Sequence, residues 1–124
     1  MKRVFSVPSL LPVLMLVIIG ASLYAVNLTG PLFWDDEAWI INNPFVHNLS
    51  LESVKNLFSE NVLAGIGLSS NYYRPLLFVT FAVNYTISGI GPVSYHIVSN
   101  ALHIFNAVLI FFLLLPIMRS RFAA

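Results

Sequence analysis

Two long stretches of this chain, residues 7–28 and 93–118, contain no Asp, Glu, Lys or Arg. A transmembrane helix rises about 1.5 Å per residue and needs about 20 apolar residues to cross the hydrocarbon core, so both stretches are long enough. The composition agrees, because only 9% of the residues are charged and the mean hydropathy is +0.84, whereas roughly a quarter of the residues are charged in soluble domains. The sequence therefore predicts an all-α membrane protein with two transmembrane helices.

The first apolar stretch allows a second interpretation, a cleaved signal peptide. It has a basic start at Lys2 and Arg3, an apolar core over residues 10–19 and small residues at 20–22, a pattern typical of secretory signals. The apolar character continues through residues 23–26, beyond such a cleavage site. An uncleaved membrane anchor is therefore the favoured interpretation.

Positive charges at the two ends of the chain predict its orientation. Lys2 and Arg3 precede the first stretch, and Arg119 and Arg121 follow the second. The positive-inside rule places all four in the cytoplasm. We therefore expect a cytoplasmic N-terminus, an extracytoplasmic loop over residues 29–92, and a location in the plasma membrane of a bacterium.

A shorter apolar segment, residues 76–88, follows Pro75 and ends before Gly89. As a helix it would be about 20 Å long, too short to cross, and Pro75 fits the first helical position. If it crossed, the terminal arginines would lie outside, against the charge rule. The segment is therefore predicted to be a juxtamembrane helix that does not cross.

The loop over residues 29–75 is predicted to contain an amphipathic helix at 50–64. Ser50 is a good N-cap. Apolar side chains recur at helical spacing at Leu51, Val54, Phe58 and Val62, with Leu57 beside them. We expect this helix to lie on the membrane surface. Residues 1–124 are interpreted as a single membrane domain.

Composition excludes several classes of protein. The formal net charge is +1 and no basic stripe is present, so nucleic acid is not an expected partner. The chain contains no cysteine, which rules out disulfides and thiolate metal sites within it.

An acidic cluster, Asp35, Asp36 and Glu37, directly follows the first apolar stretch. Charged groups are costly near hydrocarbon, so such a cluster indicates a functional site, although a solvated turn is equally compatible. A carboxylate there could act as a general base, or the cluster could hold a divalent cation. A cation is not favoured because the loop has few other oxygen ligands nearby and the histidines are not at zinc-site spacing. No cofactor is therefore expected.

Polar residues also mark one face of the second apolar stretch, in its outer half only. They fall within about 120° of the helix circumference, a position typical of a protein interior or a wet cavity. Hydrogen bonding between helices is the alternative explanation. The residues are His96, Ser99, Asn100, His103 and Asn106.

Arg74 lies between Tyr73 and Pro75, at the entrance to the short helix. An arginine at a membrane interface can bind a lipid phosphate through two parallel hydrogen bonds. The alternative is interfacial anchoring, with Tyr72 and Tyr73 in the aromatic belt and the arginine snorkelling.

In the order in which they occur along the chain, these motifs resemble the N-terminal part of the GT-C membrane glycosyltransferases. The resemblance is strongest to the protein O-mannosyltransferase-like branch, which includes members with tetratricopeptide repeats. It is carried by residues 34–44, by Tyr-Arg-Pro-Leu at 73–76, and by Tyr95-His96 with Asn100 and His103.

The resemblance implies a function and a set of site residues. The partners would be membrane lipid, a polyprenyl-phosphate sugar as the donor, and a hydroxyl on a protein or glycan as the acceptor. The acceptor hydroxyl would attack the anomeric carbon of the sugar with inversion and release polyprenyl phosphate. Asp36 would be the catalytic residue, with Asp35 as its partner. Substrate-binding roles would fall on Glu37, Tyr73, Arg74, His96, Asn100 and His103. Family members have many more spans, so we expect this chain to be a fragment that is incomplete on its own.

Two other classes of function remain. The chain could be a small non-enzymatic membrane protein that packs on a larger membrane complex, with the polar stripe joining helices. A subunit of an ion or solute carrier is less favoured, because the acids lie at the interface and not near the middle of the membrane.

Overall fold

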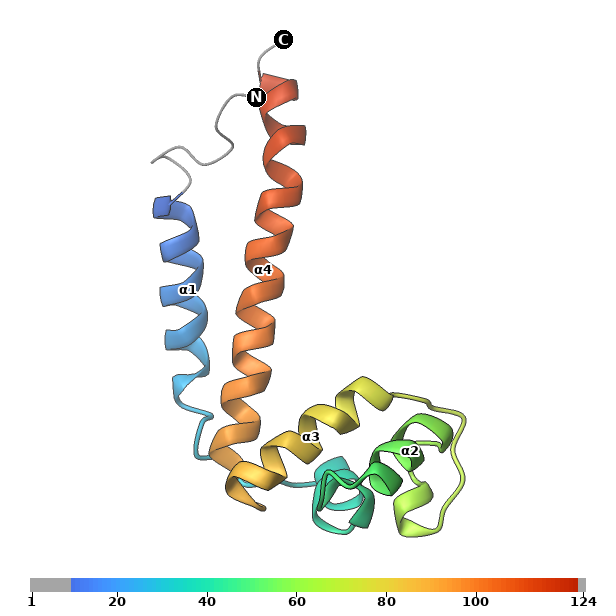
Figure 1. The fold of residues 1–124 in the computed structure, drawn as a ribbon. Helices are drawn as coiled ribbons and strands as arrows, with labels where there is room; N and C mark the ends of the chain where they lie inside the picture. Colours follow the sequence, from blue (N-terminus) through green and yellow to red (C-terminus); the bar gives the residue numbers. More distant parts are fainter. Residues whose placement is uncertain (1–9, 123–124) are drawn as a thin grey trace. The chain divides into compact units, whose positions relative to one another are not determined.

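The computed structural model describes residues 10–122, and the side chains of residues 10–117. Every element in this range is helical, which confirms the all-α prediction for the described residues. The basic residues Lys2 and Arg3 lie outside the described part, as do the side chains of Arg119 and Arg121. The elements in order are α1 (Leu10–Ala25), η2 (Glu37–Ile41), η3 (Pro44–Val46), α2 (Leu51–Ser59), η4 (Ala64–Ile66), α3 (Pro75–Ser88) and α4 (Pro92–Phe122) (Figure 1).

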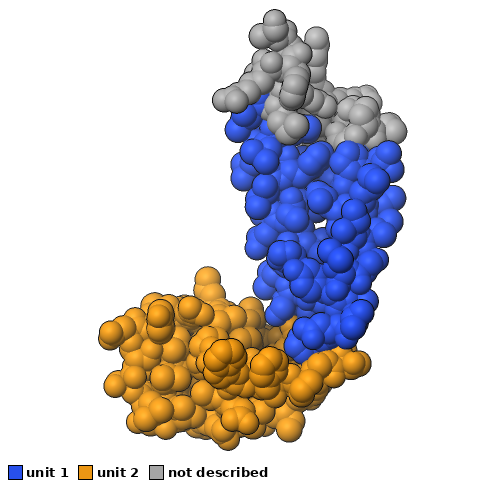
Figure 2. Space-filling model, turned by 180° about the vertical axis from the view of Figure 1, so that it is seen from behind, with its two compact units in different colours: residues 1–28, 96–124 blue, residues 29–95 orange. Residues whose placement is uncertain are grey.

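The chain divides into two compact units (Figure 2). Unit 1 comprises residues 1–28 and 96–124 and contains α1 with most of α4. Unit 2 comprises residues 29–95 and contains every element between them, together with the first residues of α4. The segment predicted to be an external loop is therefore a folded unit with its own core.

Within the described residues, α4 is the one helix long and apolar enough to cross a membrane. Its 26 residues from Pro92 to Ile117 have a mean hydropathy of 2.1, and none of the residues in its most apolar window is buried. α1 has 16 residues, about 24 Å of helix. The structure thus provides one candidate span, and a crossing by the first apolar stretch stays a prediction.

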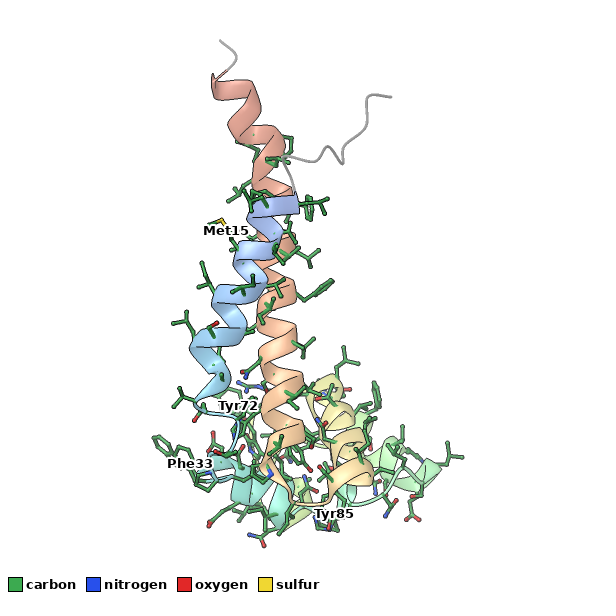
Figure 3. The ribbon with its side chains drawn as sticks, turned by 90° about the vertical axis from the view of Figure 1, so that its left-hand side faces the viewer. Met15, Phe33, Tyr72 and Tyr85 are labelled. Atoms are coloured by element: carbon green, nitrogen blue, oxygen red, sulfur yellow. The ribbon has the colours of Figure 1, made fainter. Side chains whose placement is uncertain are left out.

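The helices of unit 1 lie side by side and run in opposite directions (Figures 1 and 3). Gly20 on α1 allows a close approach, because a Cβ atom there would lie 2.7 Å from Cγ1 of Ile104 on α4. Nearby, the Tyr24 hydroxyl lies 3.3 Å from Nε2 of His103 and shares a hydrogen bond with it. The two rings meet edge to face at 5.1 Å. A member of the predicted polar stripe therefore joins the two helices.

Unit 2 is built around the short helix η3, which contacts α2, α3 and η4. Its residue Val46 is fully buried and lies in a core with Leu57 of α2 and Phe78 of α3. Trp39 from η2 packs against this core. Burial of such side chains stabilises the unit by roughly 1.5–3 kcal/mol each, which explains why a connecting segment with few regular elements is folded.

α2 begins as predicted but ends earlier. The Ser50 hydroxyl accepts a hydrogen bond from Ser53 N at 3.1 Å and caps the helix, which ends at Ser59 and does not extend to residue 64. Of the predicted apolar residues, Leu57 and Val62 are buried and Val54 is half-buried, whereas Leu51 and Phe58 are exposed. The structure buries Leu57 and Ser53, because this face meets η3 and α3 and the Ser53 hydroxyl donates to Asn48 Oδ1 at 2.7 Å.

α3 runs from Pro75 to Ser88, one residue longer than predicted, with proline at its first position. Gly89 ends it in a left-handed conformation with φ of 58°, and its amide donates to Tyr85 O at 2.7 Å. The helix buries Phe78 and Ala82 on one side. Apolar side chains remain exposed on the other side, and its place at the membrane surface stays a prediction. These exposed residues are Leu76, Val83 and Ile87.

Candidate functional site

The acidic segment of unit 2 has an unusual backbone. Trp34 has a positive φ of 60°, a conformation that few residues other than glycine adopt. A π-helix follows over Glu37–Ile41 and is closed by a hydrogen bond from Asn42 N to Glu37 O at 2.8 Å. Both features are uncommon, and π-helical turns occur frequently at functional sites. The local geometry therefore supports a functional reading of this segment.

The three predicted carboxylates differ in their surroundings. Asp36 is half-buried, and its Oδ2 accepts a hydrogen bond from Phe33 N at 3.2 Å, which fixes the carboxyl group. Asp35 and Glu37 are exposed. Within residues 10–117 no cationic side chain pairs with any of the three. Asp36 is thus the oriented carboxylate of the cluster, while its Oδ1 forms no hydrogen bond with the described residues.

Arg74 connects the acidic segment to the Tyr-Arg-Pro-Leu motif. Its guanidinium carbon lies 5.6 Å from the ring centre of Trp39 and 5.4 Å from that of Tyr72. Both distances are typical of cation–π contacts. The two sequence motifs, predicted separately, therefore meet in unit 2 through Trp39 and Arg74. We call these three residues, Trp39, Tyr72 and Arg74, the arginine clamp.

The arginine clamp leaves the edge of the guanidinium available. Among the described residues Arg74 forms no ion pair and no side-chain hydrogen bond, and it is exposed. Ring faces hold the flat surface of a guanidinium, whereas its N–H groups point outward in the plane. This arrangement presents donors in the geometry that matches a phosphate or carboxylate.

Two hydrogen bonds hold the segment before Arg74 against the end of α2 and the residues that follow it. The carbonyl of Tyr72 accepts a hydrogen bond from Val62 N at 3.1 Å, and the Tyr73 hydroxyl donates to Phe58 O at 2.7 Å. Arg74 then occupies the residue before the first turn of α3. The Tyr73 hydroxyl therefore positions the chain, and its predicted contact with substrate stays a prediction.

The predicted residues of the second apolar stretch belong to the other unit. His96, Asn100 and His103 lie in unit 1, whereas the acids and Arg74 lie in unit 2. His96 and Asn100 are half-buried, and His103 contacts Tyr24. A shared cavity of histidines and acids stays a prediction.

Sequence reasoning missed His47 as a structural residue. Its Nε2 donates to Ile40 O at 2.9 Å, and its ring stacks on that of Tyr85 at 4.2 Å with an angle of 17°. These contacts tie the end of the π-helix to α3. A single histidine in a loop carries no spacing signal, so the sequence alone could not have indicated this role.

Asn43 was missed as well, although a signal was present. The side chain is 2% exposed, and its Oδ1 accepts a hydrogen bond from Phe45 N at 3.0 Å. Asparagine directly before Pro44 is a turn signature in which the side chain bonds the backbone two residues on. That signature could have predicted the start of η3.

Metal-binding groups do not converge in the described residues. No set of three or more His, Asp or Glu side chains there is arranged to hold a metal ion.

Comparison with known proteins shows similarity to a class of sugar transfer enzymes, the protein O-mannosyl-transferases. It is 32% identical over 95 residues to protein O-mannosyl-transferase TMTC3 of Mus musculus, a match that covers 73% of this chain and 10% of that protein. It is 35% identical over 85 residues to protein O-mannosyl-transferase TMTC4 of Homo sapiens, which covers 64% of this chain and 11% of that protein. The chain thus spans about a tenth of the length of these curated relatives. No family model matches the chain, and no solved structure matches it.

Proposed function

We propose that unit 2 supplies part of the active site of a membrane glycosyltransferase, which moves a sugar from a polyprenyl-phosphate donor to a hydroxyl of a protein on the extracytoplasmic side. The observation that carries this proposal is the arginine clamp. It joins an anion-binding side chain to the segment that holds the oriented carboxylate Asp36. Similarity to the two protein O-mannosyl-transferases supports the same reaction class.

In the proposed reaction, Asp36 accepts the proton of the acceptor hydroxyl. The hydroxyl oxygen forms a bond to the anomeric carbon of the sugar while the bond from that carbon to the phosphate oxygen breaks. The electron pair leaves on polyprenyl phosphate, and the sugar is transferred with inversion. Arg74 binds the phosphate and stabilises the charge that develops on it, and Asp35 assists the base.

Further substrate contacts belong to the same proposal. Glu37 and Tyr73 of unit 2 would contact the sugar or the acceptor. The proposal also assigns substrate-binding roles to His96, Asn100 and His103 of α4. No metal or other cofactor is required for this scheme, because a general base and an arginine provide the two charges that it needs.

The test uses the complete reading frame that contains this sequence, expressed in membranes and supplied with a radiolabelled polyprenyl-phosphate hexose and acceptor peptides. A positioned general base contributes roughly 10²–10⁴-fold to the rate, so we expect Asp36→Asn to lower transfer at least about 100-fold. Glu52→Gln is the matched control, since Glu52 is an exposed acid in the first turn of α2. Transfer by Asp36→Asn at the rate of this control would exclude Asp36 as the base.

One observation favours the alternative, a non-enzymatic protein that packs on a larger membrane complex. The Tyr24–His103 contact uses a residue of the polar stripe to join helices, as that alternative requires. If the alternative is correct, the parent protein shows no sugar transfer in the same membranes. Replacing the residues of the polar stripe by alanine then abolishes co-purification of its partner proteins.

A further inference from the structure

Two aromatic side chains of unit 2 are exposed directly before the acidic cluster. Phe33 is 66% exposed and Trp34 is 84% exposed, and the Phe33 ring points outward from unit 2 (Figure 3). Neither ring stacks on another ring within the described residues, and the indole N–H of Trp34 forms no hydrogen bond with them. We call Phe33 and Trp34 the aromatic pair. The described part of the chain leaves most of its apolar surface uncovered.

The backbone presents the aromatic pair in a fixed turn. Trp34 has a positive φ of 60°. Asp36 N donates to Phe33 O and Glu37 N donates to Trp34 O, each at 3.2 Å, and the Asp36 carboxylate accepts from Phe33 N. A left-handed backbone is costly for a residue other than glycine, and exposed rings gain nothing from burial. Because unit 2 does not offset this cost, the turn indicates that the rings contact something outside it.

The distribution of charge along the chain indicates what the aromatic pair contacts. Residues 4–34 contain no Asp, Glu, Lys or Arg, and the three acids of the cluster follow at once. This uncharged stretch includes α1 and the segment that leads from it to Trp34. Apolar residues, then aromatic residues, then charged residues is the order found where a chain passes from hydrocarbon through the head-group layer into water.

Unit 2 is also joined directly to the candidate membrane span. Residues 92–95 of α4 belong to unit 2, and the same helix continues through its apolar residues to Ile117. No linker intervenes, which would keep unit 2 beside a bilayer crossed by α4. Tryptophan is enriched at the boundary between membrane and water, because its ring is apolar while its N–H can bond to water and head groups. The order of charges and this continuity both favour lipid over a protein partner.

We propose that the aromatic pair is a membrane anchor, whose rings insert into the head-group layer of the bilayer that α4 enters. The acids at 35–37 stay on the water side, because charged groups are costly in hydrocarbon, and they limit the depth of insertion. The aromatic pair thereby fixes the level of Asp36 relative to the lipid surface. This inference stands apart from the proposed sugar transfer, since a chain without that activity could carry the same anchor.

The test compares the fluorescence of the two tryptophans of the chain in lipid vesicles. The complete 124-residue chain is reconstituted in phosphatidylcholine that carries bromine atoms, which quench an indole on contact. The bromines lie either near the head group or near the ends of the acyl chains. Trp39→Phe leaves Trp34 as the reporter. Trp34→Phe leaves Trp39, which packs on the core of unit 2, as the matched control.

An indole in the head-group layer lies close to the shallow bromines, so we expect these to reduce the emission of Trp34 by about half. Bromines near the chain ends should quench Trp34 less, and neither lipid should quench Trp39. Acrylamide, an uncharged quencher dissolved in water, should quench Trp34 less than it quenches a free tryptophan derivative. These results should be the same at low and high salt, because salt screens contacts between charges and not apolar ones.

A second measurement leaves the chain unsubstituted. Fluorotryptophan gives a separate nuclear magnetic resonance signal for each tryptophan, and a nitroxide on the lipid head group should broaden the signal of Trp34 more than that of Trp39. Equal broadening of the two signals, or none, would overturn the proposal. Quenching of Trp34 by acrylamide but by neither brominated lipid would overturn it as well, and would show that the aromatic pair faces water.

Discussion

Gly65 lies directly against the buried side chain of Asn43, so closely that a Cβ atom at Gly65 would overlap the Asn43 amide. Asn43 cannot withdraw easily, since it is 2% exposed and its Oδ1 is bonded to Phe45 N. The contact holds η4 against the start of η3, in keeping with the packing of these two elements.

Gly65→Ala should therefore destabilise unit 2 by about 2 kcal/mol, the typical cost of overpacking a buried contact. Gly67→Ala is the control, because Gly67 has φ of 75° but open space around it, and backbone strain alone costs about 1 kcal/mol. Urea unfolding, followed by the fluorescence of Trp39, measures the free energy of unfolding of both variants. Trp39 is a suitable reporter because it packs on the core of unit 2. Equal stability of Gly65→Ala and the parent chain would contradict the contact.

The arginine clamp should appear as an energetic coupling between Trp39 and Arg74. A double-mutant cycle with Trp39→Leu and Arg74→Met should give a coupling energy of about 0.5–1 kcal/mol, the range for exposed cation–π pairs. Trp34 provides the control pair with Arg74, because it is 84% exposed and makes no cation–π contact with Arg74. A coupling to Trp34 as large as that to Trp39 would show that the clamp is not a direct contact.

In unit 1, Gly20→Val should push α1 away from Ile104 and disrupt the contact between Tyr24 and His103. The two rings meet at 5.1 Å, so the proton resonances of the His103 imidazole carry a ring-current shift from Tyr24. Nuclear magnetic resonance in nanodiscs should show that this shift is lost in Gly20→Val and regained when Ile104→Ala is added. Leu23→Val, at an exposed position of α1, should leave the shift unchanged.

Cysteine labelling can test the predicted orientation, because the chain has no cysteine of its own. Glu52→Cys places a thiol at an exposed position of unit 2, and Asn84→Cys places one at a position that is 4% exposed. In intact cells a membrane-impermeant maleimide should label Glu52→Cys, whereas Asn84→Cys should react only after denaturation. Labelling of Glu52→Cys only after lysis would place unit 2 in the cytoplasm and contradict the extracytoplasmic prediction.

Signals that act within one helical turn predicted three of the helix ends, whereas the predicted end of α2 at residue 64 was wrong. Ser50 caps α2, Pro75 begins α3, and Gly89 ends it with a left-handed backbone. Each depends on the residue's own hydrogen-bonding groups or allowed φ. Such preferences are present in the sequence before any tertiary contact forms.

Contacts between elements could not be predicted in the same way. The apolar pattern of α2 could not predict the burial of Ser53, because that burial depends on Asn48, whose side chain accepts a hydrogen bond from the Ser53 hydroxyl. The contact of Trp39 with Arg74 likewise depends on how η3 turns the chain between them. The spacing of residues along the sequence does not indicate how η3 turns the chain.

The π-helix at Glu37–Ile41 sets a strict requirement on chain length. Its wide turn holds an additional residue compared with an α-helical turn, and a deletion there would restore ordinary winding. Each residue of an α-helix turns the chain by about 100°, so the deletion would move the side chains of Asp35 and Asp36 to another side of the axis relative to Trp39. This segment should therefore lose its arrangement of acid and arginine when a single codon is gained or lost.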